Sequence, residues 1–179
     1  MLKPPLKHRA PDVAVDARVK LLKRDDIAQR LAAERTAGRI IVFTNGVFDV
    51  LHIGHVRYLE FARSLGDILV VGVNADSSAR ELNKGPGRPL VPQAERAEIV
   101  AALESVTYVC IFEEQRPNET IRILRPHIHV KDSAYQGAEL PEAEAVRAVG
   151  AAIRFAPRVE GRSTSEFLQR IAAAPETRA

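Results

Sequence analysis

The chain has 179 residues, 46% of them hydrophobic and 27% charged, which is enough for one sizeable core but not for two. No run approaches the roughly 20 apolar residues of a membrane span, no apolar leader opens the chain, and the single cysteine excludes an internal disulfide. A net charge of +3 with only 5% aromatic residues is unlike a nucleic-acid surface. We therefore expect a cytoplasmic protein with no membrane or nucleic-acid partner.

The first 22 residues contain three prolines and no sustained hydrophobic period, so we expect a flexible extension at 1–22 before a single domain at 23–175. From there, short apolar runs alternate with amphipathic segments. The apolar runs predict strands at 39–44, 68–73, 106–112, 127–131 and 152–155. Helical periodicity, caps and glycine stops predict helices at 25–37, 54–65, 76–82, 93–103, 117–124, 141–149 and 163–172.

This alternation of strands and helices predicts an α/β fold with a parallel sheet of about five strands and helices on both faces. In such sheets, ligands bind at the carboxyl ends of the strands, near the point where the strand order reverses. Each candidate segment described below falls just after a predicted strand.

The segment from Thr44 to His55 follows the first strand and opens the next helix, with His52 and His55 on either side of Gly54. A helix N-terminus presents unpaired N–H groups and the positive end of its dipole to phosphate. Glycine lets a phosphate chain approach the backbone, and two imidazoles can donate hydrogen bonds to phosphoryl oxygens as negative charge builds up. We interpret this segment as a phosphate-binding helix start.

A second phosphate candidate runs from Gly161 to Ser165, before the last helix. Its glycine, its hydroxyls at Ser163, Thr164 and Ser165, and the helix N-terminus could form an anion-binding nest. Alternatively, Ser163 and Glu166 form a capping box that needs no ligand. The two interpretations are compatible.

A third cluster lies on the glycine- and proline-rich loop 83–89 and on the helix after it. Lys84 and Arg88 could close over phosphates from this loop, and Arg96 could reach the site from its helix. Alternatively, Lys84 and Arg88 belong to a solvated turn and Arg96 pairs with a nearby acid.

Polar residues also follow the second strand. Asn74 and Asp76 could orient an acceptor or a ribose, although Asp76 could equally cap the next helix. Cys110 lies in an apolar strand and is expected in the core. His127 and His129 have no acid or cysteine at ligand spacing, so we interpret them as structural.

Gly46-Val-Phe-Asp49 followed by His52-Ile-Gly-His55 resembles the cytidylyltransferase-like family of nucleotidyltransferases, which implies a Rossmann-like nucleotidyltransferase fold. Within that family, the chain is most similar to the bacterial D-glycero-β-D-manno-heptose 1-phosphate adenylyltransferases, over about residues 25–172. The loops match as well as the core: Asn45, 73–76, 84–89, 95–96, 130–131 and 159–164.

The resemblance also implies residue roles. The expected nucleotide-binding residues are Asn45, Gly46, Val47, Phe48, Gly54, Arg158, Gly161, Ser163, Thr164 and Ser165. Arg158 matches an arginine that glycerol-3-phosphate cytidylyltransferases place in this motif. The expected substrate-binding residues are Asp49, Asn74, Asp76, Lys84, Arg88, Arg96 and Tyr135.

Catalytic roles are implied for His52, His55 and Lys131. Lys131 and Tyr135 remain from a Lys-Gly-Gly-Asp-Tyr pattern of the heptose enzymes, whose middle reads Asp132-Ser-Ala134 here. This change leaves the sugar specificity open.

The activity implied is transfer of the AMP moiety of ATP to a sugar 1-phosphate, namely D-glycero-β-D-manno-heptose 1-phosphate, giving an ADP-sugar and pyrophosphate. The attacking phosphate oxygen is already ionised, so no general base is needed. Mg²⁺ would arrive with ATP, held mainly by phosphate oxygens and water. A homodimer is what the family would suggest. Two alternatives stay open: a cytidylyltransferase acting on glycerol 3-phosphate or a similar alcohol phosphate, and a non-catalytic nucleotide-binding subunit.

Overall fold

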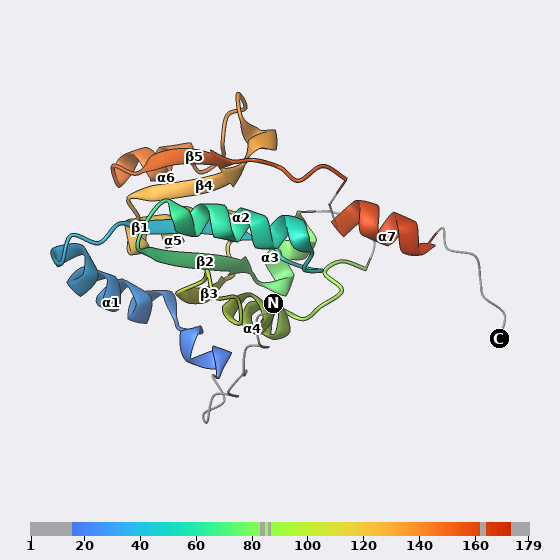
Figure 1. Ribbon diagram of the computed structural model, residues 1–179, viewed down its shortest axis with the longest axis horizontal. Coiled ribbons are helices and arrows are strands. Elements are labelled where there is room, and N and C mark those ends of the chain that lie inside the picture. The colour runs from blue at the N-terminus through green and yellow to red at the C-terminus, as the bar shows by residue number, and fades with distance from the viewer. Residues whose placement is uncertain (1–15, 83–84, 86, 162–163, 173–179) are drawn as a thin grey trace, which may run out of the picture.

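The computed structural model describes residues 16–82, 85, 87–161 and 164–172, which fold around one parallel sheet (Figure 1). Its strands are β1 Ile41–Gly46, β2 Ile68–Asn74, β3 Tyr108–Phe112, β4 Ile128–Asp132 and β5 Ala152–Ala156. Its helices are α1 Arg24–Thr36, α2 Ile53–Ser64, α3 Asp76–Glu81, α4 Gln93–Ala101, α5 Asn118–Leu124, α6 Ala143–Ala148 and α7 Thr164–Ala172, with 3₁₀ turns η1 Ala17–Lys20 and η2 Ser133–Tyr135.

The strand order is β3-β2-β1-β4-β5, and every pair is parallel. The chain winds from β1 through β2 to β3 on one side, and then returns to place β4 and β5 on the other. The order therefore reverses between β1 and β4, where a ligand crevice is expected. The predicted five-stranded parallel α/β fold is confirmed.

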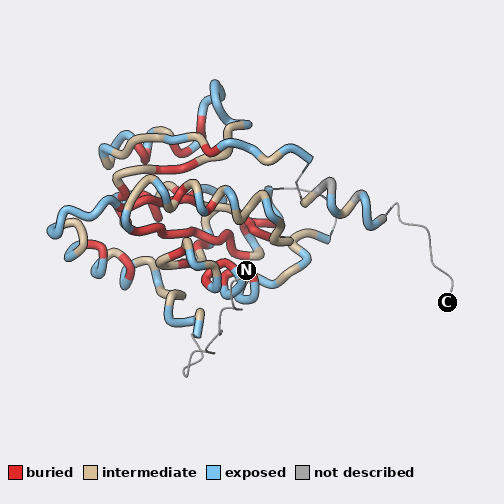
Figure 2. The backbone as a smooth tube through the Cα atoms, in the orientation of Figure 1, coloured by how far each residue is buried: buried red, intermediate tan, exposed pale blue. Residues whose placement is uncertain are grey.

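Helices cover both faces of the sheet, because alternate strand side chains point to opposite sides. On one face, Val42 and Val71 belong to a core cluster with Leu59 of α2 and Val100 of α4. On the other, Phe43 and neighbouring apolar strand residues belong to a cluster with apolar residues of α1, α5 and α6. Figure 2 shows this burial concentrated along the strands and the inner sides of the helices.

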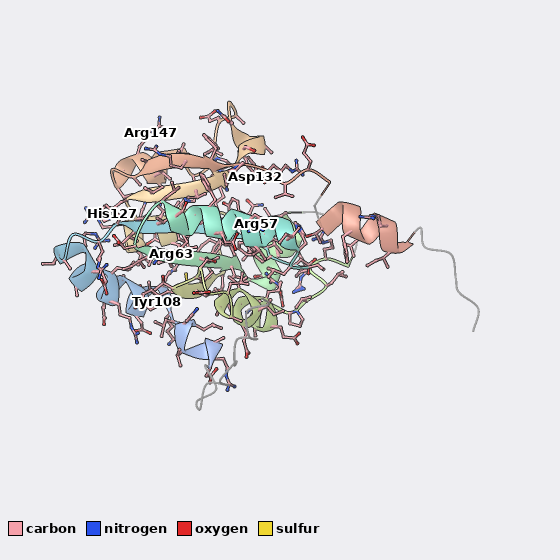
Figure 3. The ribbon with its side chains drawn as sticks, in the orientation of Figure 1. Arg57, Arg63, Tyr108, His127, Asp132 and Arg147 are labelled. Carbon is pink, nitrogen blue, oxygen red and sulfur yellow. The ribbon has the colours of Figure 1, made fainter. Side chains whose placement is uncertain are left out.

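The two ends of the sheet differ in what they present. His127 precedes β4 at one end, where its Nδ1 accepts a hydrogen bond from the Ile41 amide at 2.9 Å. Asp132 closes β4 at the carboxyl end, on the opposite side of the molecule (Figure 3). The loops that follow β1, β2, β3 and β5 emerge at that same carboxyl end because all the strands are parallel.

Residues 16–22 pack against the domain, which differs from the extension expected over 1–22. The Leu22 amide donates to Val109 O at 3.0 Å, and Lys20 Nζ donates to Leu103 O at 3.1 Å. Ala17 and Leu21 contact the first core cluster. This segment is too short to show a hydrophobic period, so the sequence pattern could not reveal its packing. Residues 1–15 lie outside the described part of the chain.

Two element boundaries moved inward for identifiable reasons. The strand expected at 39–44 begins at Ile41, because the Ile40 amide donates to the Asp67 carboxylate and not to a neighbouring strand. The helix expected at 141–149 begins at Ala143, after a turn in which the Ala143 amide donates to Leu140 O. That turn leaves Glu142 at the carboxyl end of the sheet. Across the described ranges, no helix is both long enough and apolar enough to cross a membrane.

Candidate active site

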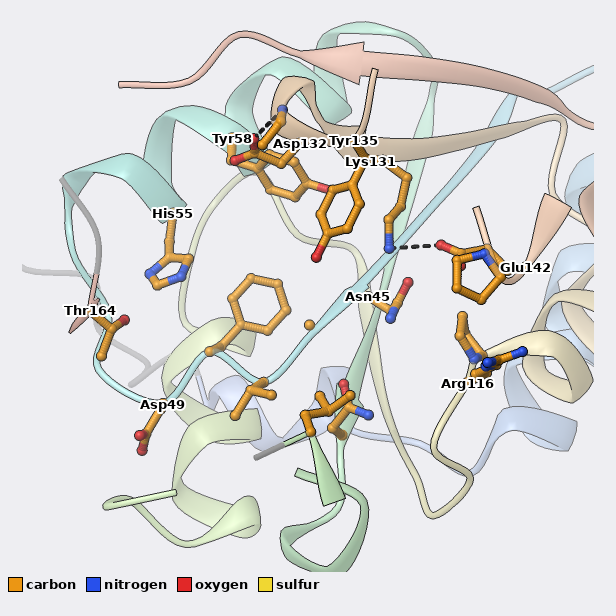
Figure 4. Close-up of a pocket in the computed structure, with 18 of the residues that line it drawn as sticks. Asn45, Asp49, His55, Tyr58, Arg116, Lys131, Asp132, Tyr135, Glu142 and Thr164 are labelled. Atoms are coloured by element: carbon orange, nitrogen blue, oxygen red, sulfur yellow. Dashed lines mark hydrogen bonds and ion pairs between the residues drawn. The ribbon is translucent and has the colours of Figure 1, made fainter. Parts of the chain in front are cut away.

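A cavity of about 630 Å³ opens at the carboxyl end of the sheet, where the strand order reverses. It is walled by the ends of β1, β2 and β4, by the N-terminal part of α2, and by loops after β3 and β5 (Figure 4). Twelve of the residues singled out in the sequence line it: Asn45, Gly46, Val47, Phe48, Asp49, His55, Asn74, Arg88, Lys131, Tyr135, Arg158 and Thr164.

Other expected site residues do not line this cavity. These are His52, Gly54, Asp76, Arg96 and Gly161. Lys84 and Ser163 lie outside the described residues, and so does the side chain of Ser165.

The two histidines at the start of α2 are held by backbone hydrogen bonds. His52 Nδ1 accepts from the Gly54 amide at 3.1 Å, and His55 Nδ1 accepts from the His52 amide at 3.4 Å. Their rings lie 4.0 Å apart. A neutral imidazole that accepts at Nδ1 carries its proton on Nε2, so both rings are set as Nε2–H donors. Together with the N-terminus of the 12-residue helix α2, they form a donor group suited to phosphate oxygens.

The loop between β1 and α2 takes a conformation unusual for its residue. Phe48 has a φ of 51°, in the left-handed region, and its ring contacts His55 at a centroid distance of 5.4 Å. A Cβ on Gly46 would stand 3.1 Å from that ring, so glycine is what allows Phe48 to close over the end of β1. The strained, buried Phe48 thus shapes the cavity floor beside His55.

Asp49 anchors a second loop. Its carboxylate forms an ion pair with Arg88 Nε at 2.8 Å and accepts hydrogen bonds from the Leu90 and Val91 amides at 2.7 and 3.0 Å. The side chain of Asp49 is only 1% exposed. Asp49 therefore positions Arg88 at the cavity by holding the segment that carries it.

Arg96 has a different place from the substrate contact considered in the sequence. It is fully buried and donates to the carbonyl oxygens of Val47, Asn74 and Val91. A fourth bond, of 2.6 Å, goes to the Asp76 carboxylate. Arg96 thus ties together the loops after β1 and β2, and the acid pair was the correct alternative. Asp76 is used in the same pair and does not cap α3, whose N-cap is Ala75.

Lys131, at the end of β4, is held on both sides. Its Nζ lies 2.7 Å from Glu142 Oε1 and 5.0 Å from the centre of the Tyr135 ring. The same Glu142 oxygen lies 3.3 Å from His129 Nε2. Burial would raise the pKa of Glu142, but the hydrogen bond from His129 and the charge of Lys131 outweigh it and lower the pKa to about 2. Burial lowers the pKa of His129, so its ring is neutral and structural, as expected.

Tyr58 joins α2 to the two central strands at the crevice. Its hydroxyl lies 2.6 Å from Thr44 Oγ1 and donates to Val130 O at 2.8 Å. Burial raises the pKa of Tyr58, which keeps the phenol neutral. The only sequence signal for this link is a tyrosine three residues after His55, which is also the spacing of an ordinary core position on a helix.

The last helix reaches the same cavity. Thr164 opens α7, and its hydroxyl donates to Val50 O at 3.3 Å, which joins α7 to the loop after β1. Figure 4 shows Thr164 close to His55, on the wall away from Lys131 and Glu142. Thr164 and the histidine segment therefore meet at this cavity, and Gly161 is not among its lining residues.

Sequence reasoning missed several cavity residues: Tyr58, Leu82, Gln115, Arg116, Pro117, Asp132, Ala134, Pro141 and Glu142. Arg116 and Glu142 had no motif signal, because the other residues that line the cavity come from distant parts of the chain. The carboxylate that pairs with Lys131 belongs to Glu142 and not to the adjacent Asp132. Asp132 Oδ1 instead accepts a hydrogen bond from the Ala134 amide at 2.8 Å, which shapes the 3₁₀ turn η2.

No group of three or more His, Cys, Asp or Glu side chains in the described ranges could hold a metal ion. Asn45 lines the cavity, and its buried Oδ1 finds no hydrogen-bond partner among the described residues.

The model of the cytidylyltransferase-like family matches residues 43–170, which contain this whole site. The chain belongs to that family of nucleotidyltransferases. Two curated relatives are each called bifunctional protein HldE. The one from Trichlorobacter lovleyi is 43% identical over 166 residues, and the one from Pelobacter propionicus is 46% identical over 156 residues. These matches cover 93% and 87% of this chain, but the chain spans only about a third (32%) of the length of each relative.

Solved structures share the fold. The lipopolysaccharide core biosynthesis protein from Thermoplasma volcanium is 30% identical, with a TM-score of 0.56, and the match covers 68% of this chain and 98% of that protein. Pantothenate synthetase from Thermus thermophilus is 16% identical with a TM-score of 0.59, covering 89% and 69% of the two chains, and shows likeness of fold alone.

Proposed function

We propose that this chain is an adenylyltransferase that transfers the AMP moiety of ATP to D-glycero-β-D-manno-heptose 1-phosphate. The products would be the ADP-sugar and pyrophosphate. The resemblance of its motifs to heptose 1-phosphate adenylyltransferases supports this substrate pair, as does its similarity to HldE proteins and to a lipopolysaccharide core biosynthesis protein. Because ATP is its donor, the reaction belongs in the cytoplasm.

One observation carries the proposal: His55 and the N-terminus of α2 face Lys131 across a single cavity at the reversal of strand order. That arrangement offers hydrogen-bond donors on one wall and a cation on the other. The site can therefore hold two phosphorylated molecules side by side, which a transfer between them requires.

The chemistry would be an in-line displacement at the α-phosphorus of ATP. An oxygen of the sugar phosphate forms a bond to the α-phosphorus while the bond to the oxygen bridging to the β-phosphorus breaks. Pyrophosphate leaves with that electron pair. The nucleophile is an ionised phosphate oxygen, so the protein supplies positioning and charge stabilisation without taking a proton.

The triphosphate would lie against the histidine wall. The Nε2–H groups of His52 and His55 and the Thr164 hydroxyl would donate to its oxygens as charge moves toward the leaving pyrophosphate. Arg158 would add a positive charge, with Gly161, Ser163 and Ser165 assigned here by family resemblance. Asn45, Gly46, Val47 and Phe48 would shape the nucleotide subsite, and the buried Asn45 Oδ1 supports a donor group of the ligand there.

The acceptor would lie toward Lys131. Tyr135 and Asn74 line that region, and Asp49 would act through the Arg88 loop that it holds. Lys84 is assigned here by resemblance alone. Arg96 and Asp76 would support the site from behind, since their bond lies outside the cavity. Mg²⁺ would enter with ATP and neutralise phosphate charge, held by phosphate oxygens and water.

The test is pyrophosphate release by the purified chain with Mg²⁺. ATP, CTP and GTP are each offered with D-glycero-β-D-manno-heptose 1-phosphate and with glycerol 3-phosphate. Turnover with ATP and the heptose phosphate alone is the expected result. Turnover with CTP and glycerol 3-phosphate would replace the proposal with a cytidylyltransferase, and nucleotide binding without any turnover would indicate a non-catalytic subunit.

A further inference from the structure

We infer that Arg116, on the loop between β3 and α5, binds the phosphate of the acceptor on the cavity wall that faces away from His55. This inference rests on the proposed function and assigns a residue to its acceptor subsite. The ligand class is a sugar phosphate whose phosphate is the attacking group.

Displacement geometry fixes where the acceptor must lie. The attacking and leaving oxygens stand on opposite sides of the α-phosphorus. If pyrophosphate leaves along the wall of His55 and Thr164, the acceptor phosphate approaches from the other wall. Figure 4 shows Arg116 and Glu142 on that opposite wall, where Glu142 pairs with Lys131.

Charge pairing singles out Arg116 among the cations of this cavity. Lys131 is paired with Glu142 at 2.7 Å, and Arg88 is paired with Asp49 at 2.8 Å. Among the described residues, the two cavity-lining cations without a carboxylate partner are Arg116 and Arg158. Arg158 is assigned to the triphosphate, which leaves Arg116 as the uncompensated charge for the second phosphorylated substrate.

The loop that carries Arg116 is held at both ends. Glu114, two residues earlier, forms a 2.6 Å ion pair with Arg24 at the start of α1. Pro117, the next residue, is buried at the start of α5 and also lines the cavity. Gln115 and Arg116 therefore lie on a segment that is held on either side, and both line the cavity. A guanidinium in such a place can bind a phosphate through two parallel hydrogen bonds.

A neighbouring arginine provides a matched control. Arg147 of α6 lines a second, adjacent hollow together with Arg116, but it does not line the main cavity. Arg116→Ala and Arg147→Ala remove the same charge from the same region of the surface, and only the first removes it from the proposed subsite.

The experiment measures KM for each substrate and, separately, acceptor binding to protein saturated with a non-hydrolysable ATP analogue. Arg116→Ala should weaken acceptor binding and raise acceptor KM by about tenfold or more, the cost of a charged hydrogen bond. Its ATP KM and melting temperature should stay close to wild type. Arg116→Lys should recover part of the loss, and Arg147→Ala should resemble wild type.

The outcomes separate this inference from the proposed function. Wild-type turnover with an unchanged acceptor KM in Arg116→Ala would overturn the role of Arg116 and leave the activity standing. A rise in ATP KM equal to that for the acceptor would also overturn it. Absence of wild-type turnover and of acceptor binding would overturn the proposed function itself.

Discussion

Replacing Arg96 by methionine tests whether this arginine acts as a buried structural link. Methionine has a similar reach but no donors, so the carbonyl oxygens of Val47, Asn74 and Val91 would lose their partner. Asp76 would also lose its ion pair, although its side chain is 27% exposed and can be partly hydrated.

The expected loss of stability follows from these contacts. A buried acceptor left without a partner costs about 1–3 kcal/mol, and breaking a buried ion pair by removing one member costs about 3–5 kcal/mol. These terms overlap, and water can reach Asp76, so we expect a total of about 3–5 kcal/mol. The total free energy of unfolding of a protein of this size is roughly 5–15 kcal/mol. Because each kcal/mol lost lowers the melting temperature of such a chain by a few degrees, the melting temperature should fall by roughly 10 °C.

Urea unfolding followed by circular dichroism measures this loss, with Arg80→Met as the control. Arg80 lies on α3 and is exposed, so the same substitution there should change stability by no more than about 0.5 kcal/mol. A folded Arg96→Met protein with near-wild-type stability and a raised substrate KM would refute the structural role. That pattern would mean that Arg96 contacts substrate after all.

Three further predictions concern the cavity. His55→Ala should lower kcat by about 10²–10³ while the far-ultraviolet spectrum is unchanged, because one phosphate donor is lost; a near-wild-type rate would rule out that role. Glu142 has a folded pKa of about 2, below its ordinary 4.5, so the stability it contributes is present above about pH 4.5 and is lost as the pH falls toward 2. The unfolding free energy of Glu142→Gln should therefore fall less steeply over that range than that of wild type, and parallel curves would contradict the assignment. Asp49→Asn should destabilise the fold by about 3 kcal/mol in urea unfolding, because Arg88 loses its buried partner; a loss under about 1 kcal/mol would contradict that anchor.

The elements were predictable because local chemistry sets most of them. The runs around Val42 and Val70 are apolar on both sides, as strands covered on two faces must be. The order of the strands was not predictable, since a hydrophobic period tells which face a residue occupies and not which strand is its neighbour. The pairing of Phe43 with His129 joins β1 to β4, which are neighbours in the sheet although β2, β3 and several helices lie between them in the sequence.

The residues that we propose for the nucleotide could be singled out in the sequence for a different reason. Its features lie within one short segment from Asn45 to His55, or at one helix start at Thr164, so their spacing is visible in the sequence. Arg96 shows the limit of that approach. Its residue type suits both a phosphate contact and a buried ion pair, and only its complete burial decides between them.

The proposed acceptor side depends on residues that come together only in three dimensions. Arg116 follows β3, Lys131 ends β4, and Glu142 precedes α6, yet all three line one cavity. The segment after Lys131 differs from the Lys-Gly-Gly-Asp-Tyr pattern, but the difference changes the structure only locally. Asp132 accepts a hydrogen bond from the Ala134 amide, and Lys131 Nζ still lies over the Tyr135 ring. The carboxylate beside Lys131 comes from Glu142 on the next element. We therefore expect Arg116 and Glu142 together to determine which acceptor this chain uses. Kinetic discrimination between sugar phosphates is the property that should respond most to changes at these two residues.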